Sequence, residues 1–374
     1  MNHSRLFLLS TLTYLISASS ATADTPPPSS SQITVAQDGT VHVPSYELPL
    51  SIYMSDQAKQ AYIKARTSPA VELPHDIVKL RETLDRLHYE PRIARAKEVY
   101  PVSITDTRIA GVHVNIVVPA AGVDPSKRDR VLINLHGGGM EVGEIYGGLL
   151  ESIPFAAVDK IKIVAVDYRE APEHRYPAAN EDVVAVYAEL LKQYQPEDIG
   201  IYGCSAGAGL TAMSLAWFQE KGLPTPGAAG IFCLGADYKV AGDSSFTAAP
   251  LIEFLGARVS VPPPDSQTKE QHDDYLGDTS LESPLIAPAL YPTVLAKFPP
   301  VLLITGSRDI AMSSTIHTHA ELVNVGVDAE LHVWDGMWHS FFDDVDLPES
   351  KEVYKVTADF FDSHLGKRSR SPGH

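Results

Sequence analysis

Gly203-Cys204-Ser205-Ala206-Gly207 is the stretch of this sequence that decides the fold. It follows the apolar run Ile199–Tyr202 and opens a helical stretch, Ala206–Lys221. A G-x-S-x-G turn between a strand and a helix presents a serine hydroxyl at the helix N-terminus, where backbone amides favour developing negative charge. The alternative is a serine that only caps a helix. The strand-turn-helix context favours a nucleophile at Ser205.

Outward from this turn, short apolar runs alternate with helical stretches. Continuous apolar runs of this length indicate strands that are buried on both faces, as in a parallel sheet. Val102–Ile109 and Val112–Val118 alternate in polarity around Ala110-Gly111, which predicts an antiparallel pair before the parallel part. The pattern therefore predicts an α/β fold with a mostly parallel central sheet flanked by helices. The other expected strands are Val131–Leu135, Ile161–Val166, Ile231–Leu234, Val301–Ile304 and Leu331–Trp334, and the other expected helices are Ala179–Tyr194, Ser313–Val325 and Ser350–Leu365.

Two segments interrupt or precede this alternation. Residues 43–95 read as helices with proline interruptions, and Asp76–Leu87 places Ile77, Leu80, Leu84 and Leu87 on one face. Residues 238–297 are long, proline-rich and irregular, with a helical piece near Ala249–Leu255. An insertion of this length in one domain is usually functional. We expect both segments to form a cap over the active site of a single domain, residues 41–374.

A glycine run supplies a second signal, directly after the expected strand Val131–Leu135. His136-Gly137-Gly138-Gly139 leaves backbone amides uncovered by side chains, so that they can point at an oxyanion as it forms in acyl transfer. A plain glycine-rich turn is the structural alternative. A phosphate loop is disfavoured because there is no Gly-Lys-Ser/Thr. His136 is expected to anchor the loop rather than to act as a base.

An acid and a histidine follow Ser205 in the order that such a serine requires. Asp309 lies just beyond the expected strand Val301–Ile304, at the edge of the sheet where catalytic groups gather. His339 lies beyond Leu331–Trp334 and before the last helix, a position suited to a mobile base. The chain has 14 histidines, and His339 stands out by its loop and its order alone.

Composition excludes other classes of protein. The formal net charge is −17 without a dense basic stripe, so nucleic acid is not an expected partner.

Residues 1–23 have a polar start with Arg5, a short apolar run and Ala21-Thr22-Ala23, which is typical of a secretory signal peptide. Residues 24–40 are expected to form a flexible leader, and no other segment is apolar enough to span a membrane. Cys204 and Cys233 fall in expected buried strand ends, which favours free thiols over a disulfide.

These segments together resemble the hormone-sensitive-lipase-like family of α/β-hydrolases, the bacterial family IV esterases. The resemblance extends from about Val102 to Leu365 and includes Asp167–His174, D-Y-R-E-A-P-E-H, which is similar to the D-Y-R-x-A-P-E segment of that family. It implies the α/β-hydrolase fold, with Ser205 as nucleophile, His339 as general base and Asp309 as the orienting carboxylate. It also implies an oxyanion hole made of the amides of Gly138, Gly139 and Ala206. No cofactor or metal is expected.

The chain departs from the family pattern beside these residues. Cys204 replaces a usual Asp or Thr, Ala208 a common Gly, Met140 a usual Phe or Trp, and Glu170 a usual Leu. These changes leave hydrolysis in place and affect substrate preference. Met140 and Trp338 are the candidate walls of a substrate pocket.

The resulting prediction is a secreted or periplasmic carboxylesterase that acts on short-to-medium acyl esters of small molecules, with the chain length implied by the resemblance alone. A lactone or thioester hydrolase with the same triad is the enzyme alternative. A non-catalytic ligand-binding relative would have lost a triad residue, and an interaction protein with an acidic surface would leave the Ser-Asp-His order unexplained. A homo-oligomer stays open.

Overall fold

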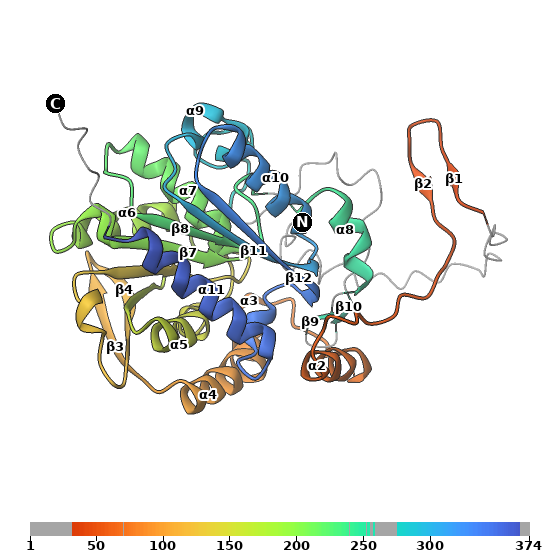
Figure 1. The fold of residues 1–374 in the computed structure, drawn as a ribbon, viewed down its shortest axis with the longest axis horizontal. Coiled ribbons are helices and arrows are strands. Elements are labelled where there is room, and N and C mark those ends of the chain that lie inside the picture. Colours follow the sequence, from red (N-terminus) through yellow and green to blue (C-terminus); the bar gives the residue numbers. More distant parts are fainter. Residues whose placement is uncertain are drawn as a thin grey trace.

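An eight-stranded sheet runs through the middle of the molecule, in the order β12-β11-β8-β7-β5-β6-β4-β3 (Figure 1). The computed structural model describes residues 32–69, 71–238, 240–251 and 275–366, and the backbone of 253–254 and 257–258. Pairing in this sheet is antiparallel only between β3 and β4 and between β4 and β6, so the predicted mostly parallel sheet is confirmed. The strands are β3 (Val102–Ile109), β4 (Val112–Pro119), β5 (Val131–Leu135), β6 (Lys162–Val166), β7 (Ile199–Cys204), β8 (Ala228–Phe232), β11 (Val301–Arg308) and β12 (Ala329–Trp338).

Helices cover both faces of this sheet and enclose one apolar cluster on each side (Figure 1). Side chains alternate between the two clusters along a strand, because successive residues point to opposite faces. In β5, for example, Ile133 and Leu135 join one cluster and Leu132 joins the other. The helices are α2 (Asp56–Thr67), α3 (Ile77–Leu84), α4 (Glu90–Val99), α5 (Gly147–Asp159), α6 (Ala178–Leu190), α7 (Ala206–Glu220), α8 (Asp243–Thr247), α9 (Pro292–Leu295), α10 (Met312–Asn324) and α11 (Pro348–His364).

Helix α5 was not expected from the sequence. It begins at Gly147-Gly148 and contains Pro154, both of which disfavour a helix interior. The helix is buried on nearly all sides, so it lacks the polar face that creates a helical period. Packing against β4, α4 and α11 decides its conformation instead.

The expected helix over Asp76–Leu87 is divided at Leu84. Helix α3 buries Ile77, Leu80 and Leu84, as the period predicts. A π-helical turn, η1 (Asp85–Tyr89), then inserts an extra residue per turn and shifts the buried face to His88 and Tyr89. Leu87 is consequently only half-buried.

The two expected cap segments contact each other near the end of β12. The Tyr62 hydroxyl, on α2, donates a hydrogen bond of 2.9 Å to the carbonyl of Leu251, in the insertion. The Tyr62 ring also lies 6.0 Å from the ring of Trp338. The insertion forms α8 at Asp243–Thr247 and a 3₁₀ turn, η4, at Ala249–Leu251. The expected helical piece near 249–255 is therefore confirmed only in its first residues, because Glu253–Phe254 is a short strand, β9. Residues 259–274 lie outside the described residues.

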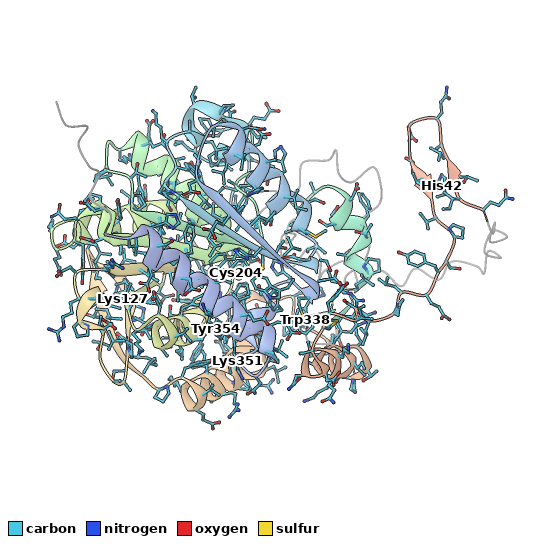
Figure 2. All side chains as sticks on the ribbon, viewed as in Figure 1. His42, Lys127, Cys204, Trp338, Lys351 and Tyr354 are labelled. Atoms are coloured by element: carbon cyan, nitrogen blue, oxygen red, sulfur yellow. The ribbon has the colours of Figure 1, made fainter. Side chains whose placement is uncertain are left out.

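A short hairpin, β1 (Thr34–Val35) and β2 (Val41–His42), precedes the first helix and projects from the body, where Figure 2 labels His42. It falls partly within the expected leader. The expected signal peptide lies outside the described residues and stays a prediction. Every helix in the described part of the chain is too short or too polar to cross a bilayer.

Candidate active site

The turn at Ser205 has the strained geometry expected of a nucleophile between a strand and a helix. Ser205 has φ 56° and ψ −124°, in the region that a residue with a side chain rarely adopts, and it joins β7 to α7. Its amide donates to the carbonyl of Phe232 at 2.8 Å, which fixes the turn to the end of β8. Glycine is required beyond it, because a Cβ on Gly207 would lie 1.8 Å from the carbonyl oxygen of Leu135. The strand and the helix therefore hold Ser205 in one orientation.

The structure brings Ser205, His339 and Asp309 together in one chain of hydrogen bonds. His339 Nε2 lies 2.9 Å from Ser205 Oγ, and His339 Nδ1 lies 2.8 Å from Asp309 Oδ1. Because the carboxylate can only accept, Nδ1 carries the proton and Nε2 is left to accept from the serine hydroxyl. Asp309 follows β11 and His339 follows β12, and these two strands are neighbours in the sheet. Because these strands are neighbours, Asp309 and His339 lie next to each other in space.

Asp309 is held by groups that the sequence did not point to. Its side chain is fully buried, and its Oδ2 accepts a hydrogen bond of 3.0 Å from the Thr305 hydroxyl. The amide of Ala311 donates to Oδ1 at 2.9 Å. Burial disfavours a charged His339, but the adjacent Asp309 carboxylate outweighs it and raises the pKa of His339 above its usual value of 6.5.

The glycine loop lies against the serine turn. A Cβ on Gly137 would lie 3.2 Å from Ser205 Cβ and 3.0 Å from the carbonyl oxygen of Cys204. Gly138 and Gly139 have φ 124° and 66°, so the loop needs residues without side chains there. Ala206 is the first residue of α7, and its amide has no partner within the helix. The amides of the expected oxyanion hole thus come from two segments that touch.

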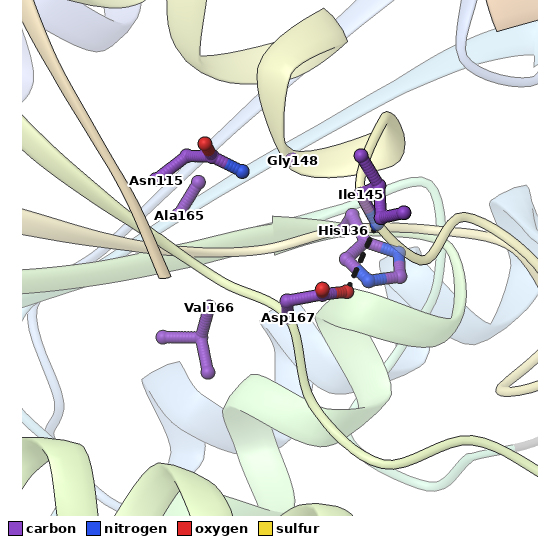
Figure 3. A pocket seen from close by; sticks show the side chains of 7 residues that line it. All are labelled: Asn115, His136, Ile145, Gly148, Ala165, Val166 and Asp167. Atoms are coloured by element: carbon purple, nitrogen blue, oxygen red, sulfur yellow. Dashed lines mark hydrogen bonds between the residues drawn. The ribbon is translucent and has the colours of Figure 1, made fainter. Parts of the chain in front are cut away.

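His136 anchors the glycine loop, as expected. Its Nδ1 donates to the carbonyl of Gly137 at 2.7 Å, and its ring stacks on Tyr168 with centroids 4.3 Å apart. The Tyr168 hydroxyl donates to the His136 carbonyl at 2.7 Å. A small cavity adjoins this ring, and its other lining residues are Asn115, Ile145, Gly148, Ala165, Val166 and Asp167 (Figure 3). Within it, the amide of Ile145 donates to Asp167 at 3.0 Å.

The two candidate pocket residues differ in their surroundings. Met140 is fully buried in the apolar cluster on one face of the sheet and has φ 63°. Trp338 is half-buried beside His339 and faces Tyr62 of the N-terminal segment. A role of either residue in a substrate pocket stays a prediction.

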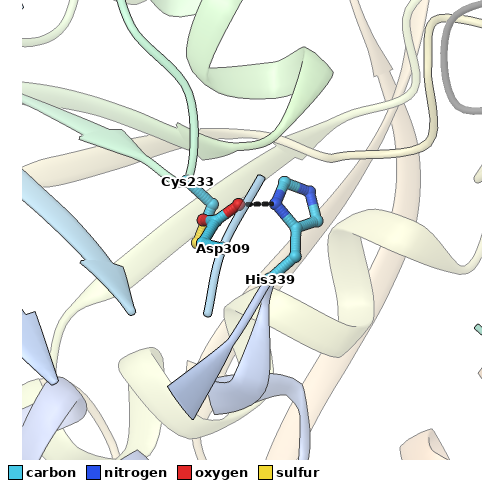
Figure 4. Close-up of side chains that lie close together, drawn as sticks. All are labelled: Cys233, Asp309 and His339. Carbon is cyan, nitrogen blue, oxygen red and sulfur yellow. Dashed lines mark hydrogen bonds and ion pairs between the residues drawn. The ribbon is translucent and has the colours of Figure 1, made fainter. Parts of the chain in front are cut away.

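Both thiols lie next to the catalytic candidates and are unpaired. Cys204 and Cys233 are buried, as expected, and neither forms a disulfide. Cys204 Sγ lies 2.9 Å from Ser340 Oγ, and the amide of Ser340 donates to Cys233 Sγ at 3.4 Å. The Cys233 thiol, the Asp309 carboxylate and the His339 imidazole offer ligand atoms within 4.8 Å of one another (Figure 4). A metal there would compete with the hydrogen bonds that Asp309 and Ser205 already make to His339.

Sequence reasoning missed two charged groups around the loop. Glu151, on α5, is buried and accepts hydrogen bonds behind Gly137. Arg81, on α3, donates to the carbonyls of Glu141 and Ala171 at 2.7 and 2.8 Å and lies 3.5 Å from the buried Glu170. A lone acid in the mostly apolar run Leu149–Phe155 was the only signal for Glu151.

The sheet order, the strained serine turn and the hydrogen-bonded Asp-His-Ser arrangement define the class of the α/β-hydrolases. A family model of the alpha/beta hydrolase fold (Abhydrolase_3) matches residues 132–343, more than half of the chain, and this protein belongs to that family. The resemblance drawn from the motifs is thereby confirmed.

The relatives of this chain are esterases, which confirms the predicted class of enzyme. An acetyl-hydrolase from Streptomyces hygroscopicus is 28% identical over 80% of this chain and 98% of its own length. An esterase from Acinetobacter venetianus is 27% identical over 69% of this chain and 82% of its own. The crystal structure of esterase E25 is 30% identical, with a TM-score of 0.71 over 87% of this chain and 98% of its own. A hormone-sensitive lipase from a metagenome library is 25% identical, with a TM-score of 0.67 over 83% and 97%.

Proposed function

We propose that this protein is a serine carboxylic ester hydrolase that acts on short-to-medium acyl esters through an acyl-enzyme. The observation that carries the proposal is the pair of hydrogen bonds, 2.8 and 2.9 Å long, that joins Asp309 to His339 and His339 to Ser205. A serine hydroxyl is a weak nucleophile until a neighbouring base accepts its proton. His339 Nε2 lies within hydrogen-bond reach of that proton, as a general base must.

In the proposed reaction, Ser205 Oγ attacks the ester carbonyl while its proton moves to His339 Nε2. The carbonyl oxygen becomes an oxyanion that accepts hydrogen bonds from the amides of Gly138, Gly139 and Ala206. The tetrahedral intermediate then expels the alcohol, which takes the proton from His339, and leaves an acyl group on Ser205. Water repeats the sequence and releases the carboxylic acid. Asp309 holds the imidazole in the required tautomer and stabilises its protonated form.

The preference for shorter acyl groups is supported by relatives rather than by a measured pocket. One relative is named an acetyl-hydrolase, and another, 30% identical over 29% of this chain, is named a versiconal hemiacetal acetate esterase.

We further propose that the protein is exported, on the basis of the signal-peptide pattern of residues 1–23. N-terminal sequencing of the protein recovered from outside the cytoplasm tests export, and a retained residue 1 in that fraction would contradict cleavage.

The function is tested by the hydrolysis of nitrophenyl esters of increasing acyl length, by the wild type and by Ser205→Ala. We expect activity that is highest on short chains and that falls to background in the variant. Labelling of Ser205 by a fluorophosphonate gives a second readout that does not depend on the ester chosen. A folded wild type that hydrolyses no ester and is not labelled contradicts the proposal. Labelling without ester hydrolysis shifts the assignment to a lactone or a thioester.

A further inference from the structure

A buried carboxyl group accepts hydrogen bonds from the strand and the loop that lead into the expected oxyanion hole. Glu151 belongs to α5 and is only 6% exposed. Its Oε1 accepts a hydrogen bond of 3.0 Å from the amide of Gly137, and its Oε2 accepts one of 2.8 Å from Asn134 Nδ2, on β5. Both oxygens of one side chain are therefore committed to the strand and loop that lead into Gly138.

The amide that this carboxyl group holds belongs to a residue that lies against the serine turn. A Cβ on Gly137 would lie 3.0 Å from the carbonyl oxygen of Cys204 and 3.2 Å from Ser205 Cβ. Burial raises the pKa of Glu151 well above its usual value and the nearby Asp343 adds to this, whereas the hydrogen bonds from Asn134 and from the amide of Gly137 favour the charged form. Glu151 thus fixes the residue of the glycine loop that packs against the serine turn.

A carboxyl group at this place is not needed for packing alone. The neighbours of Glu151 on α5, Leu150 and Ile153, are buried apolar side chains, and an apolar residue of similar volume would fill the site without the cost of desolvating a charge. An apolar residue would, however, leave the Gly137 amide and Asn134 without an acceptor. The carboxyl group of Glu151 accepts both of these hydrogen bonds and so fixes the glycine loop.

We propose that Glu151 is a positioning residue of the reaction: its carboxyl group holds Gly137, and with it the glycine loop, against the serine turn, so that the amides of Gly138, Gly139 and Ala206 converge on one oxygen. This inference rests on the proposed function, because an oxyanion hole has a role only if an oxyanion forms at Ser205. Glu151 does not touch the substrate and acts through Gly137.

The amides of the oxyanion hole stabilise the transition state more than they stabilise the bound ester. The oxygen gains negative charge only as Ser205 attacks, so a displaced amide weakens the transition state more than the ground state. Loss of one donor from an oxyanion hole lowers kcat by about 10²–10³-fold. A loop that is displaced but still present should lower it by less, roughly 10- to 100-fold.

The experiment is a graded series on ester hydrolysis with Glu151→Gln, Glu151→Leu and Asp159→Asn. Glu151→Gln keeps an acceptor for Gly137 but loses the second acceptor, whereas Glu151→Leu loses both. We expect kcat to fall in the order wild type, Gln, Leu, with KM changed by less than about threefold. The affinity of a trifluoromethyl ketone, which forms a tetrahedral adduct with the serine, should fall in parallel with kcat/KM.

Asp159→Asn is the matched control. Asp159 is a buried acid on the same helix, about 12 Å further along its axis, and it pairs with Lys127 away from the serine turn. Its replacement should lower the melting temperature and leave kcat and KM close to those of the wild type.

Equal kcat in the wild type and in both folded Glu151 variants would overturn the proposal, as would an effect confined to KM. Where Glu151→Leu does not fold, the comparison of Glu151→Gln with Asp159→Asn still decides, because a purely structural role predicts the same kcat in both. A wild type without activity on any ester contradicts the proposed function instead, so the two failures are distinguishable.

Discussion

Ser205 and His339 are separated by 134 residues in the sequence, yet Ser205 Oγ lies 2.9 Å from His339 Nε2. Their contact depends on the order of strands in the sheet. Ser205 follows β7 and His339 follows β12, with β8 and β11 between these two strands. The sharp turn at Ser205 and the loop after β12 both lie at the carboxyl end of the parallel strands, where the open ends of such sheets form sites.

The pH dependence of activity should follow the protonation of His339. Its pKa is raised above 6.5 by the Asp309 carboxylate against the effect of burial, and only the neutral imidazole can accept the proton of Ser205. The value of kcat/KM should therefore fall as the pH is lowered, with a midpoint above 6.5. In Asp309→Asn the cause of the raised pKa is gone, so the midpoint moves down and the rate falls by about 10⁴-fold.

The measurement is a pH profile of kcat/KM for both proteins. Asp328→Asn is the control, because Asp328 pairs with His364 on the surface at 3.3 Å, away from Ser205. An unchanged midpoint in Asp309→Asn would show that another group controls the acid limb.

The Arg81 side chain should contribute strongly to stability. It donates to two backbone carbonyls and lies 3.5 Å from Glu170, whose carboxyl oxygens lack a hydrogen-bond donor among the described residues. Arg81→Met removes the guanidinium that lies against that buried acid and should lower the free energy of unfolding by about 2–4 kcal/mol. The double variant Arg81→Met/Glu170→Leu should recover part of that loss, because no buried acid is then left unpaired.

Urea denaturation of the three proteins measures this effect. Arg95→Met is the matched control, because Arg95 pairs with Asp346 where both side chains are about half exposed, and such pairs contribute little. A double variant that is no more stable than Arg81→Met would assign the loss to the other contacts of Arg81, the two backbone carbonyls and the ion pair with Glu173 at 3.0 Å.

Gly207 should tolerate no side chain. A Cβ there would lie 1.8 Å from the carbonyl oxygen of Leu135 and 2.6 Å from that of His136, and both atoms belong to backbone that cannot move freely. We expect Gly207→Ala to unfold the protein or to abolish its activity, as judged by circular dichroism and ester hydrolysis. Gly122→Ala is the comparison, because nothing lies within 4 Å of its Cβ and only the positive φ is penalised, by about 1 kcal/mol. Equal stability of the two variants would show that the strand and the helix can separate.

Both cysteines should be unreactive in the native protein. Cys204 and Cys233 are buried and unpaired, and burial raises the pKa of both thiols, that of Cys233 to about 11. A thiol-specific disulfide reagent should therefore label neither residue in the native state. In denaturant it should label both of the two cysteines in the chain. No free thiol after denaturation would mean that the exported protein pairs them.

The sequence by itself determined the sheet, the serine turn, the glycine loop and the places of Asp309 and His339. A local sequence pattern predicts each of these features, such as an apolar run, a G-x-S-x-G turn or an acid just beyond a strand. Strand order in this class then made the acid and the histidine meet at Ser205, so their contact followed from chain order without any knowledge of side-chain packing.

Only the tertiary structure decided the rest of the site. Helix α5 has no polar face because neighbouring elements bury nearly all of it, and the period that would reveal it is missing. The roles of Glu151 and Arg81 depend on distances to backbone groups far away in the sequence, as in the 60-residue separation of Arg81 and Glu141. The local sequence around a charged side chain does not show whether that side chain will bind water or a buried amide. Its partner depends on how distant segments pack together.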